Sequence, residues 1–298
     1  MNQPHVEAGV DRVAFDRLLG KLRPRLHRYC ARMTGSVIDG EDVVQETMIK
    51  ALEAFPSTGV ILNAEGWLFR IAHNAALDFL RRRARSAANH SDEDPEMMID
   101  PKVVIRDREI AAASLRTFMR LPPAQRSSVI LMDVLGCSLE EIGAVTDATV
   151  PAIKAALHRG RARLRELARE PEDISLPALA ERERALLEAY VDRFNARDVD
   201  AVRAMLADEV RLDLVARRKL AGRSEVSKYF GNYAKTEDWH LVPGLVEGRA
   251  AALVFDPADS PGQPGYFVLL DWSADGVVTI RDFRYARYAI EGAEVVVL

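Results

Sequence analysis

Cysteine is scarce in this chain, whose 298 residues include only Cys30 and Cys137. Two isolated thiols without CxxC or Cys/His spacing exclude a disulfide framework and a cysteine-rich zinc site. We therefore expect both to be small buried residues. No other motif indicates a metal ion, and no cofactor is predicted.

Long hydrophobic runs and an excess of positive charge are missing as well. No stretch of eighteen apolar residues occurs, and the opening residues MNQPHVEAGVDR lack a basic segment followed by an apolar run. Because such features mark membrane spans and secretion signals, we predict a cytoplasmic protein without a membrane partner. The formal net charge is −4. Any affinity for nucleic acid must therefore come from local basic patches.

Two basic helical segments are present. The segment WLFRIAHNAALDFLRRRAR spans residues 67–85, and TVPAIKAALHRGRARLREL spans residues 149–167. Apolar residues recur in both at three- and four-residue intervals, which is the period of an amphipathic helix. Either segment alone is also compatible with a solvated, charge-laced helix. Two of them in a chain of negative net charge predict a protein that touches DNA at two places.

From Val10 to Arg85 the apolar residues recur with a helical period, and nothing there alternates like a strand. Asp39 is predicted to cap the second helix of this block. Residues 56–66, PSTGVILNAEG, read as a loop between helices because Pro and Gly interrupt the period. After Arg85 the polar and acidic stretch SAANHSDEDPEMMIDP predicts a linker.

A second helical block carries the signals of a helix-turn-helix. Ser138 is followed three residues later by Glu141, the spacing of a capping box. Thr149 can cap the next helix, and Pro151 is tolerated in its first turn. A short helix, a tight turn and a longer basic helix define the motif.

From Glu181 onward the pattern changes. Two helical stretches, 181–197 and 198–206, precede four strand-like runs: residues 209–216, 249–257, 264–272 and 276–288. Asp275 and Gly276 give a hairpin turn between the last two runs. Helices followed by strands indicate an α+β domain.

The chain is therefore predicted to be multidomain, with two all-α domains followed by an α+β domain. The predicted division is a first helical domain, an acidic linker, a helix-turn-helix domain, a second linker and the α+β domain, at residues 10–86, 87–105, 106–170, 171–180 and 181–298.

The two basic helices are suited to different nucleic-acid contacts. In a helix-turn-helix the second helix enters the major groove, which places Lys154 and Arg159 near base edges and Arg163 and Arg165 near phosphates. The earlier helix combines aromatic and amide groups with arginine, which suits unstacked bases and single-stranded backbone. Trp67 within it is expected to be a core residue rather than a stacking platform.

The helix predicted before the basic segment 67–85 has an acidic face. It is made of Asp39, Glu41, Asp42, Gln45 and Glu46. Such a face is usually solvated. Because carboxylates repel phosphate, and because this face belongs to a domain expected to approach DNA, a protein partner is its more economical explanation.

Together these segments resemble the extracytoplasmic-function (ECF) sigma factors of bacterial RNA polymerase. DGEDVVQETMIKALEAF resembles region 2.2, which docks on the clamp helices of the polymerase. The basic helix at 67–85 resembles regions 2.3 and 2.4, which melt and read the −10 element, and residues 121–164 resemble region 4, which binds the −35 element and the flap.

The resemblance implies three sets of site residues. The core-polymerase contact would comprise Asp39, Glu41, Asp42, Gln45 and Glu46. The −10 contact would comprise His73, Asn74, Asp78, Arg81 and Arg82. The −35 contact would comprise Lys154, His158, Arg159, Arg161 and Arg163. Pro151 and Gly160 depart from the helix-favouring sequence expected there.

The segment after residue 180 resembles the SnoaL-like cone, a curved antiparallel sheet wrapped by helices. In sigma factors with such a tail it is a fused regulator, which implies an intramolecular contact with the sigma domains. No catalytic residue is predicted. The alternative is a DNA-binding regulator whose tail is a small-molecule sensor or isomerase-like enzyme, with a pocket formed by Tyr233, Trp239, His240, Asp271 and Tyr285.

Overall fold

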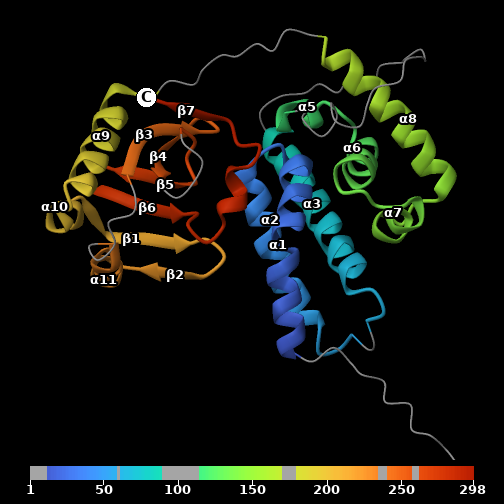
Figure 1. Ribbon diagram of the computed structural model, residues 1–298, viewed down its shortest axis with the longest axis horizontal. Helices are drawn as coiled ribbons and strands as arrows, with labels where there is room; N and C mark the ends of the chain where they lie inside the picture. Colours follow the sequence, from blue (N-terminus) through green and yellow to red (C-terminus); the bar gives the residue numbers. More distant parts are fainter. Residues whose placement is uncertain (1–11, 59–60, 89–113, 170–178, 234–239, 257–261) are drawn as a thin grey trace, which may run out of the picture. The chain divides into compact units, whose positions relative to one another are not determined.

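A computed structural model describes residues 12–58, 61–88, 114–169, 179–233, 240–256 and 262–298, apart from the side chains of residues 87, 88, 232 and 233. The chain forms two compact units, residues 1–172 and 173–298 (Figure 1), each built on its own hydrophobic cluster. The predicted linkers at 87–105 and 171–180 fall almost wholly outside the described residues.

The first unit begins with α1 (Arg12–Thr34), α2 (Val37–Ala54) and α3 (Ala64–Ala88). Their apolar faces meet in one core, in which Phe15 and Tyr29 are fully buried. Helices α1 and α2 cross closely at Gly40, where a Cβ would lie 2.6 Å from the backbone of Ala31. Trp67 packs beside Phe15, with ring centroids 6.0 Å apart, as expected of a core residue.

The start of α2 corrects one prediction. Ser36, and not Asp39, is the N-cap, because its side-chain oxygen accepts a hydrogen bond of 3.1 Å from the backbone N–H of Asp39. Asp39 lies in the first turn, where a carboxylate is favourable beside the helix dipole. Both residues have capping side chains three positions apart, so the pattern alone did not separate them.

The rest of this unit comprises α5 (Leu115–Met119), α6 (Pro123–Val129), the π-helical segment η1 (Ile130–Val134), α7 (Leu139–Thr146) and α8 (Val150–Leu167). The capping box of Ser138 and Glu141 is formed at α7. Thr149 caps α8 with Pro151 in the first turn, and Asp147 makes the tight turn with φ of 60°. The predicted helix-turn-helix is confirmed.

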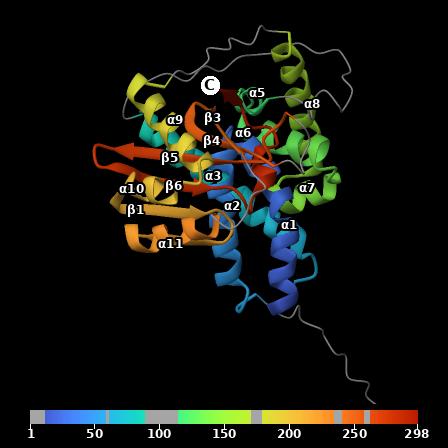
Figure 2. The same ribbon diagram turned by 60° about the vertical axis from the view of Figure 1, so that its left-hand side comes forward.

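The described part of the second unit comprises three α-helices and a seven-stranded sheet. The helices are α9 (Glu181–Asn195), α10 (Val199–Ala204) and α11 (Arg223–Tyr233), and a 3-10 turn, η2, spans Arg287–Ile290. The strands are β1 (Leu206–Leu214), β2 (Arg218–Ala221), β3 (His240–Val246), β4 (Arg249–Phe255), β5 (Tyr266–Ser273), β6 (Gly276–Asp282) and β7 (Val295–Val297). Helix α9 lies across β3 and β4, and α11 lies beside β1 (Figures 1 and 2).

The strand order is β2-β1-β6-β5-β4-β3-β7. All described pairs are antiparallel except β1 and β6, which run parallel, so the sheet is mixed rather than antiparallel as expected. The connection from β1 to β6 passes through four other strands and α11, which is long enough to return the chain in the same direction. The curved α+β architecture itself is as predicted.

Strand β3 was missed in the sequence because it contains Pro243 and Gly244, residues that normally interrupt strands. Gly244 is required there, since a Cβ would lie 2.5 Å from Leu253 and 2.6 Å from the Val296 carbonyl. The hairpin predicted at Asp275 and Gly276 joins β5 to β6, with φ of 126° at Gly276.

Candidate nucleic-acid interface

Helix α8 presents three of its predicted DNA-binding residues to solvent. Lys154, His158 and Arg159 are exposed, and none forms an ion pair with another described residue. The opposite face packs into the core through Ile153, Leu157 and Leu164. A helix held by its apolar face offers its cationic face to the groove and phosphates of a duplex.

Gly160 belongs to that buried face. A Cβ at this position would lie 2.8 Å from Cγ2 of Val129 and 3.3 Å from Cβ of Gln125, so glycine permits the close crossing of α8 with α6. The departure from a helix-favouring residue is therefore a packing requirement. It costs about 1 kcal/mol of helix propensity relative to alanine.

The other two residues of the predicted −35 contact, Arg161 and Arg163, are engaged within the protein. Arg161 donates from Nε to Oδ2 of Asp133 at 2.9 Å and pairs with the other carboxylate oxygen as well. The Asp133 side chain is only 2% exposed. Arg163 pairs with Glu166 at 3.0 Å. Arg161 thus has a structural role that sequence reasoning missed, because the buried carboxylate lies 28 residues away.

Helix α3 exposes Asn74, Arg81 and Arg82, while Asp78 is half-buried and pairs with Arg81 at 2.9 Å. These four of the five residues assigned to the −10 contact share the solvent side of the helix. The basic end of the helix is thus available to a strand of nucleic acid, with an amide and arginines suited to bases and phosphates.

His73 does not share that surface. It is 6% exposed, and its Nδ1 lies 2.7 Å from the Tyr29 hydroxyl inside the core. Burial lowers the pKa of His73 to about 4, so the ring is neutral at pH 7. Its role is to form a hydrogen bond with the buried Tyr29 hydroxyl. The two residues are 44 positions apart in the sequence, so no local pattern reveals this contact.

The acidic face of α2 is less uniform than its sequence. Asp42 is exposed, and Gln45 and Glu46 are half-buried. Glu41 is 1% exposed and accepts a hydrogen bond from Nε of Arg23 at 3.2 Å, so it does not belong to the exposed face. The α-helical period turns it inward, toward α1.

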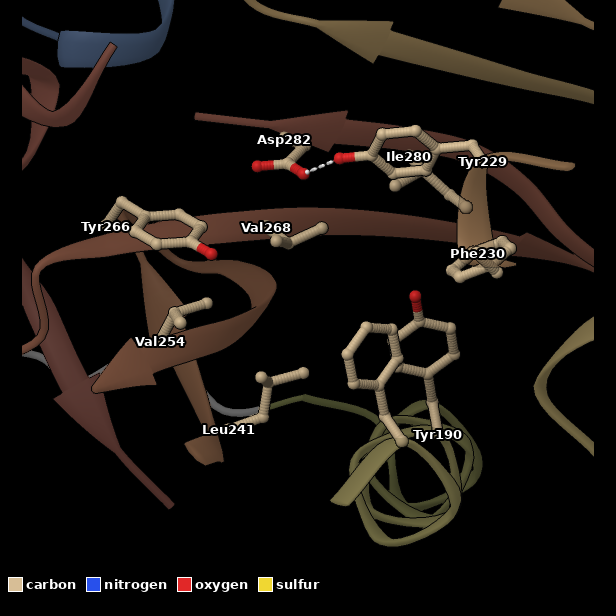
Figure 3. Close-up of a pocket in the computed structure, with 10 residues that line it drawn as sticks. Tyr190, Tyr229, Phe230, Leu241, Val254, Tyr266, Val268, Ile280 and Asp282 are labelled. Carbon is tan, nitrogen blue, oxygen red and sulfur yellow. Dashed lines mark hydrogen bonds between the residues drawn. The ribbon is translucent and has the colours of Figure 1, made fainter. Parts of the chain in front are cut away.

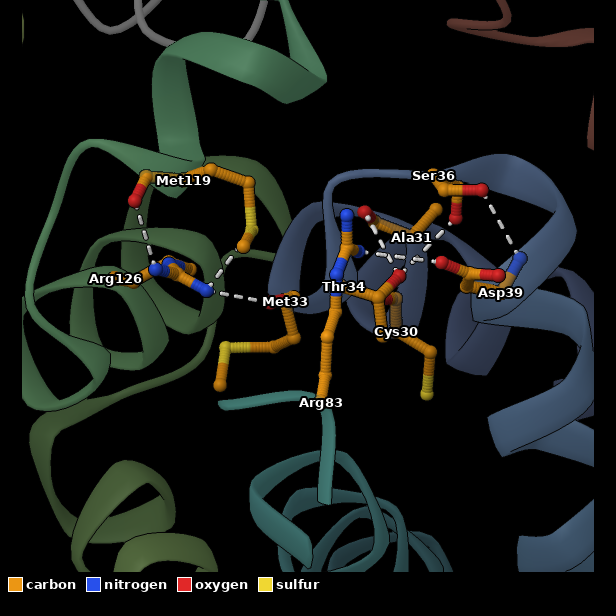
Figure 4. Close-up of polar contacts among 9 residues, drawn as sticks. All are labelled: Cys30, Ala31, Met33, Thr34, Ser36, Asp39, Arg83, Met119 and Arg126. Atoms are coloured by element: carbon orange, nitrogen blue, oxygen red, sulfur yellow. Dashed lines mark hydrogen bonds and ion pairs between the residues drawn. The ribbon is translucent and has the colours of Figure 1, made fainter. Parts of the chain in front are cut away.

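Carboxylates of α2 pair with arginines of α3. Glu46 lies 3.0 Å from Arg82 and 2.7 Å from Lys50, and Asp39 lies 3.4 Å from Arg83 (Figure 4). Partial burial alone would raise the pKa of Glu46, but hydrogen bonds from Lys50 and Arg82 hold it below its usual value. The predicted polymerase-contact and −10 residues other than the buried Glu41 and His73 therefore adjoin in one surface of mixed charge.

The second unit contains a small cavity between its helices and its sheet (Figure 3). Asp282 is 2% exposed there and accepts a hydrogen bond of 2.7 Å from the Tyr229 hydroxyl and one of 2.8 Å from the backbone N–H of Arg284. Burial, together with the charge of Asp282, raises the pKa of Tyr190 on the facing helix. The cavity volume is about 20 Å³, which holds about one water molecule.

The residues expected to form a pocket do not line this cavity. His240 is exposed, Asp271 pairs with Arg249 at 3.6 Å, and Tyr285 is 45% exposed beneath the guanidinium of Arg217. Trp239 and the side chain of Tyr233 lie outside the described residues. The cavity instead uses the inward positions of the strands: Val254, Tyr266, Val268, Ile280 and Asp282.

Comparison with known proteins identifies the first unit as that of a sigma-70-type sigma factor. The family model of sigma-70 region 2 matches residues 18–86, and that of sigma-70 region 4 matches residues 115–164. Among the described residues, no helix is long and apolar enough to cross a membrane.

Three relatives are similar to this chain. ECF RNA polymerase sigma factor SigE of Mycolicibacterium smegmatis is 34% identical over 161 residues, covering 51% of this chain and 61% of SigE. SigM of Mycobacterium tuberculosis is 32% identical, covering 53% of this chain and 78% of SigM. SigG of Mycobacterium tuberculosis is 27% identical, covering 86% of this chain and 77% of SigG. The chain belongs to the ECF RNA polymerase sigma factors.

Proposed function

We propose that this chain binds core RNA polymerase, recognises the −10 and −35 promoter elements and starts transcription. One observation supports this proposal. The expected polymerase, −10 and −35 contacts each have exposed polar or charged residues, and they follow one another along the chain in that order. The protein would act in the cytoplasm, where core polymerase and promoter DNA are its partners.

The polymerase contact would lie on α2, with Asp42, Gln45 and Glu46 against the clamp helices. The exposed Ile49, one turn further along α2, adds an apolar group to this otherwise polar surface. An apolar group among polar ones is typical of a protein interface rather than of a DNA-binding face.

The DNA contacts would lie on α3 and α8. Asn74, Arg81 and Arg82 would meet the −10 strand, and Lys154, His158 and Arg159 would meet the −35 duplex. His73, Glu41 and Arg161 would support these surfaces from within. Region 4 would also contact the polymerase flap.

The test is multi-round transcription with core polymerase on DNA from around the protein's own gene. Full-length protein is expected to give specific transcripts, and the Lys154→Ala/Arg159→Ala double variant to lose most of them. The matched control, Arg182→Ala/Arg193→Ala, removes two exposed arginines from α9 and should leave the transcripts unchanged. Absence of transcripts together with absence of binding to core polymerase would overturn the proposal.

We further propose that the second unit is a SnoaL-like regulator fused to the sigma factor and acts through contact with regions 2 and 4. The fusion of the second unit to the sigma domains is supported by the similarity to SigG, which extends over 86% of this chain. Ending the chain at Arg169 should change the amount of transcript but not the promoters chosen, because both DNA-reading helices precede that point. A changed promoter preference with unchanged output would contradict this role.

The alternative, a tail that senses or isomerises a small molecule, is less well supported. A cavity of about 20 Å³ holds no ligand larger than water without rearrangement. The same truncation also tests this alternative. If transcript levels respond to an added apolar compound only when the tail is present, the tail senses a small molecule.

A further inference from the structure

Basic side chains gather at one end of the sheet in the second unit. The parallel pairing of β1 with β6 sets Leu214 beside Asp282, so the chain leaves both strands at the same end of the sheet (Figure 1). Residues 211–219 and 281–287 contain seven arginines or lysines and two acidic residues. The unit as a whole is acidic, since residues 173–298 contain 21 acidic and 16 basic residues. A local excess of positive charge therefore lies in a unit of negative net charge.

The two acidic residues at this end of the sheet are buried or already paired. Asp282 is 2% exposed and is hydrogen-bonded inside the unit. The Asp213 side chain is 17% exposed, and its Oδ2 lies 3.7 Å from Nζ of Lys219 and 3.8 Å from Nε of Arg281. Neither carboxylate thus offsets the charge of the cations that lie further out on the surface.

The turn between β1 and β2 carries the exposed cations. Arg217 and Arg218 are exposed, and neither forms an ion pair with another residue of the described ranges. The side chain of Lys219, the next residue, is 63% exposed. These three cations and Tyr285, which follows β6 and contacts Arg217, are called the hairpin patch.

Tyr285 holds the Arg217 side chain in place. The guanidinium carbon lies 4.7 Å from the centroid of the Tyr285 ring, which is 45% exposed. The backbone N–H of Arg217 donates to the Leu214 carbonyl at 2.8 Å, and Ala216 has φ of 67°, so the turn is tight. A cation–π contact uses the face of a guanidinium and leaves the N–H donors in its plane available. Arg217 is therefore pre-organised to bind an anion.

The composition of the hairpin patch indicates a polyanion rather than a protein surface as its partner. Protein interfaces are built around an apolar centre. Of the large hydrophobic residues exposed in the described part of the second unit, one is Tyr285 and the other, Val297, lies on β7 at the opposite edge of the sheet. Arginine binds phosphate through paired N–H donors, and lysine binds it as a point charge. The phosphate backbone of a nucleic acid fits both.

We propose that the hairpin patch is a further nucleic-acid contact of this chain, at which Arg217, Arg218 and Lys219 bind the phosphate backbone. The proposal goes beyond the proposed function and rests on it only for the choice of promoter DNA as the nucleic acid. Because phosphates carry no sequence information, this contact adds affinity without altering promoter choice. It gives the second unit a direct means of changing the amount of transcript.

Fluorescence anisotropy tests the proposal with the full-length protein and a labelled duplex that lacks promoter elements, over a salt series. Arg217→Gln/Arg218→Gln should weaken binding about five- to tenfold at low salt and reduce the slope of log affinity against log salt by about 2. Arg182→Gln/Arg193→Gln, which removes two exposed arginines from α9 of the same unit, is the control of equal charge and should leave both quantities unchanged.

Two single variants test the role of the ring. Tyr285→Leu removes the surface on which Arg217 rests and should weaken binding about twofold. Tyr285→Phe keeps that surface and should bind as the wild type does. Equal losses in both variants would show that the ring does not position Arg217.

Three outcomes would overturn the inference. They are an unchanged DNA affinity of Arg217→Gln/Arg218→Gln, an equal loss in the α9 control, and a loss of affinity for core polymerase in place of DNA, which would assign the patch to a protein partner. Lys154→Ala/Arg159→Ala in the same assay separates this inference from the proposed sigma function. A loss in the patch variant alone would count against the −35 contact, and a loss in the α8 variant alone would count against the hairpin patch.

Discussion

Helices α3 and α8 are both basic, yet their cations have different surroundings. In α3 the arginines at 81, 82 and 83 each pair with a carboxylate: Asp78, Glu46 and Asp39. In α8 the exposed Lys154, His158 and Arg159 form no ion pair with a described residue, while Arg161 pairs with the buried Asp133 carboxylate.

This difference teaches that the charge of a helix and its capacity to attract phosphate are separate properties. Unpaired cations on α8 form a positive face suited to the duplex, where phosphate contacts dominate affinity. The paired arginines of α3 form a surface of mixed charge beside the exposed amide of Asn74, so on the proposed function contacts with bases would contribute more to binding there. The predictions below test this contrast.

The largest expected effect separates two arginines of the same helix. Arg161→Met would leave the buried Asp133 carboxylate without its cation, which should lower the free energy of unfolding by about 3 kcal/mol. Arg159→Met changes an exposed residue and should alter it by less than about 0.5 kcal/mol. Urea denaturation of both variants provides the comparison. Equal losses of unfolding free energy in the two variants would show that the Arg161–Asp133 ion pair contributes no more to stability than an exposed arginine does.

A second test separates neighbours on α3, the buried His73 and the exposed Asn74. Because burial lowers the pKa of His73 to about 4, the unfolded state binds its proton more tightly, and stability contributed by neutral His73 is lost as pH falls below about 6.5. Between pH 7 and pH 5 the wild type should lose about 2 kcal/mol more than His73→Gln. Glutamine retains an acceptor for Tyr29, and Asn74→Gln is the matched control.

In the pH test, His27 is a second buried histidine with a lowered pKa, and it is present in every variant. Its contribution cancels in the difference between wild type and His73→Gln. A wild-type pH dependence equal to that of the variant would contradict the assignment of His73 to the core.

The same contrast explains which features could be read from the sequence. Capping at Ser138 and Thr149, the helix-turn-helix and the exposed cations of α8 follow from local spacing, and all were predicted. The inward roles of His73, Glu41 and Arg161 depend on partners 44, 18 and 28 residues away. A helix period identifies a buried face, but it does not tell which polar residue there has a partner.

The tail shows the same limit. Helices α9 and α10 and four of its strands were predicted, because helical period, alternation and hairpin residues are local signals, whereas α11 was not predicted. The parallel pairing of β1 with β6 and the tight packing around Gly244 are set by contacts between distant strands. The cavity residues were mispredicted because the direction of each side chain follows from register, which sequence alone does not fix.

A third test concerns DNA affinity. The double variant Lys154→Ala/Arg159→Ala should weaken binding of the polymerase complex to promoter duplex by tenfold or more, and reduce the slope of log affinity against log salt by about 2. Fluorescence anisotropy over a salt series measures both. Arg182→Ala/Arg193→Ala is the control of equal charge. An unchanged slope would place these residues away from phosphate.

The smallest expected effect concerns the carboxylate that pairs with Arg82. Glu46→Gln removes a partly exposed ion pair, and such pairs contribute about 0 to 1 kcal/mol, so Arg82 should become modestly more available to phosphate. Affinity of the protein without polymerase for single-stranded DNA should rise by about two- to threefold at low salt, and the gain should shrink as salt screens the charges. Asp16→Asn removes an equivalent exposed pair, with Arg12 on α1. An equal gain of single-stranded DNA affinity in Asp16→Asn would show that the change in net charge alone causes the increase. The distinction between paired cations on α3 and unpaired cations on α8 would then not hold.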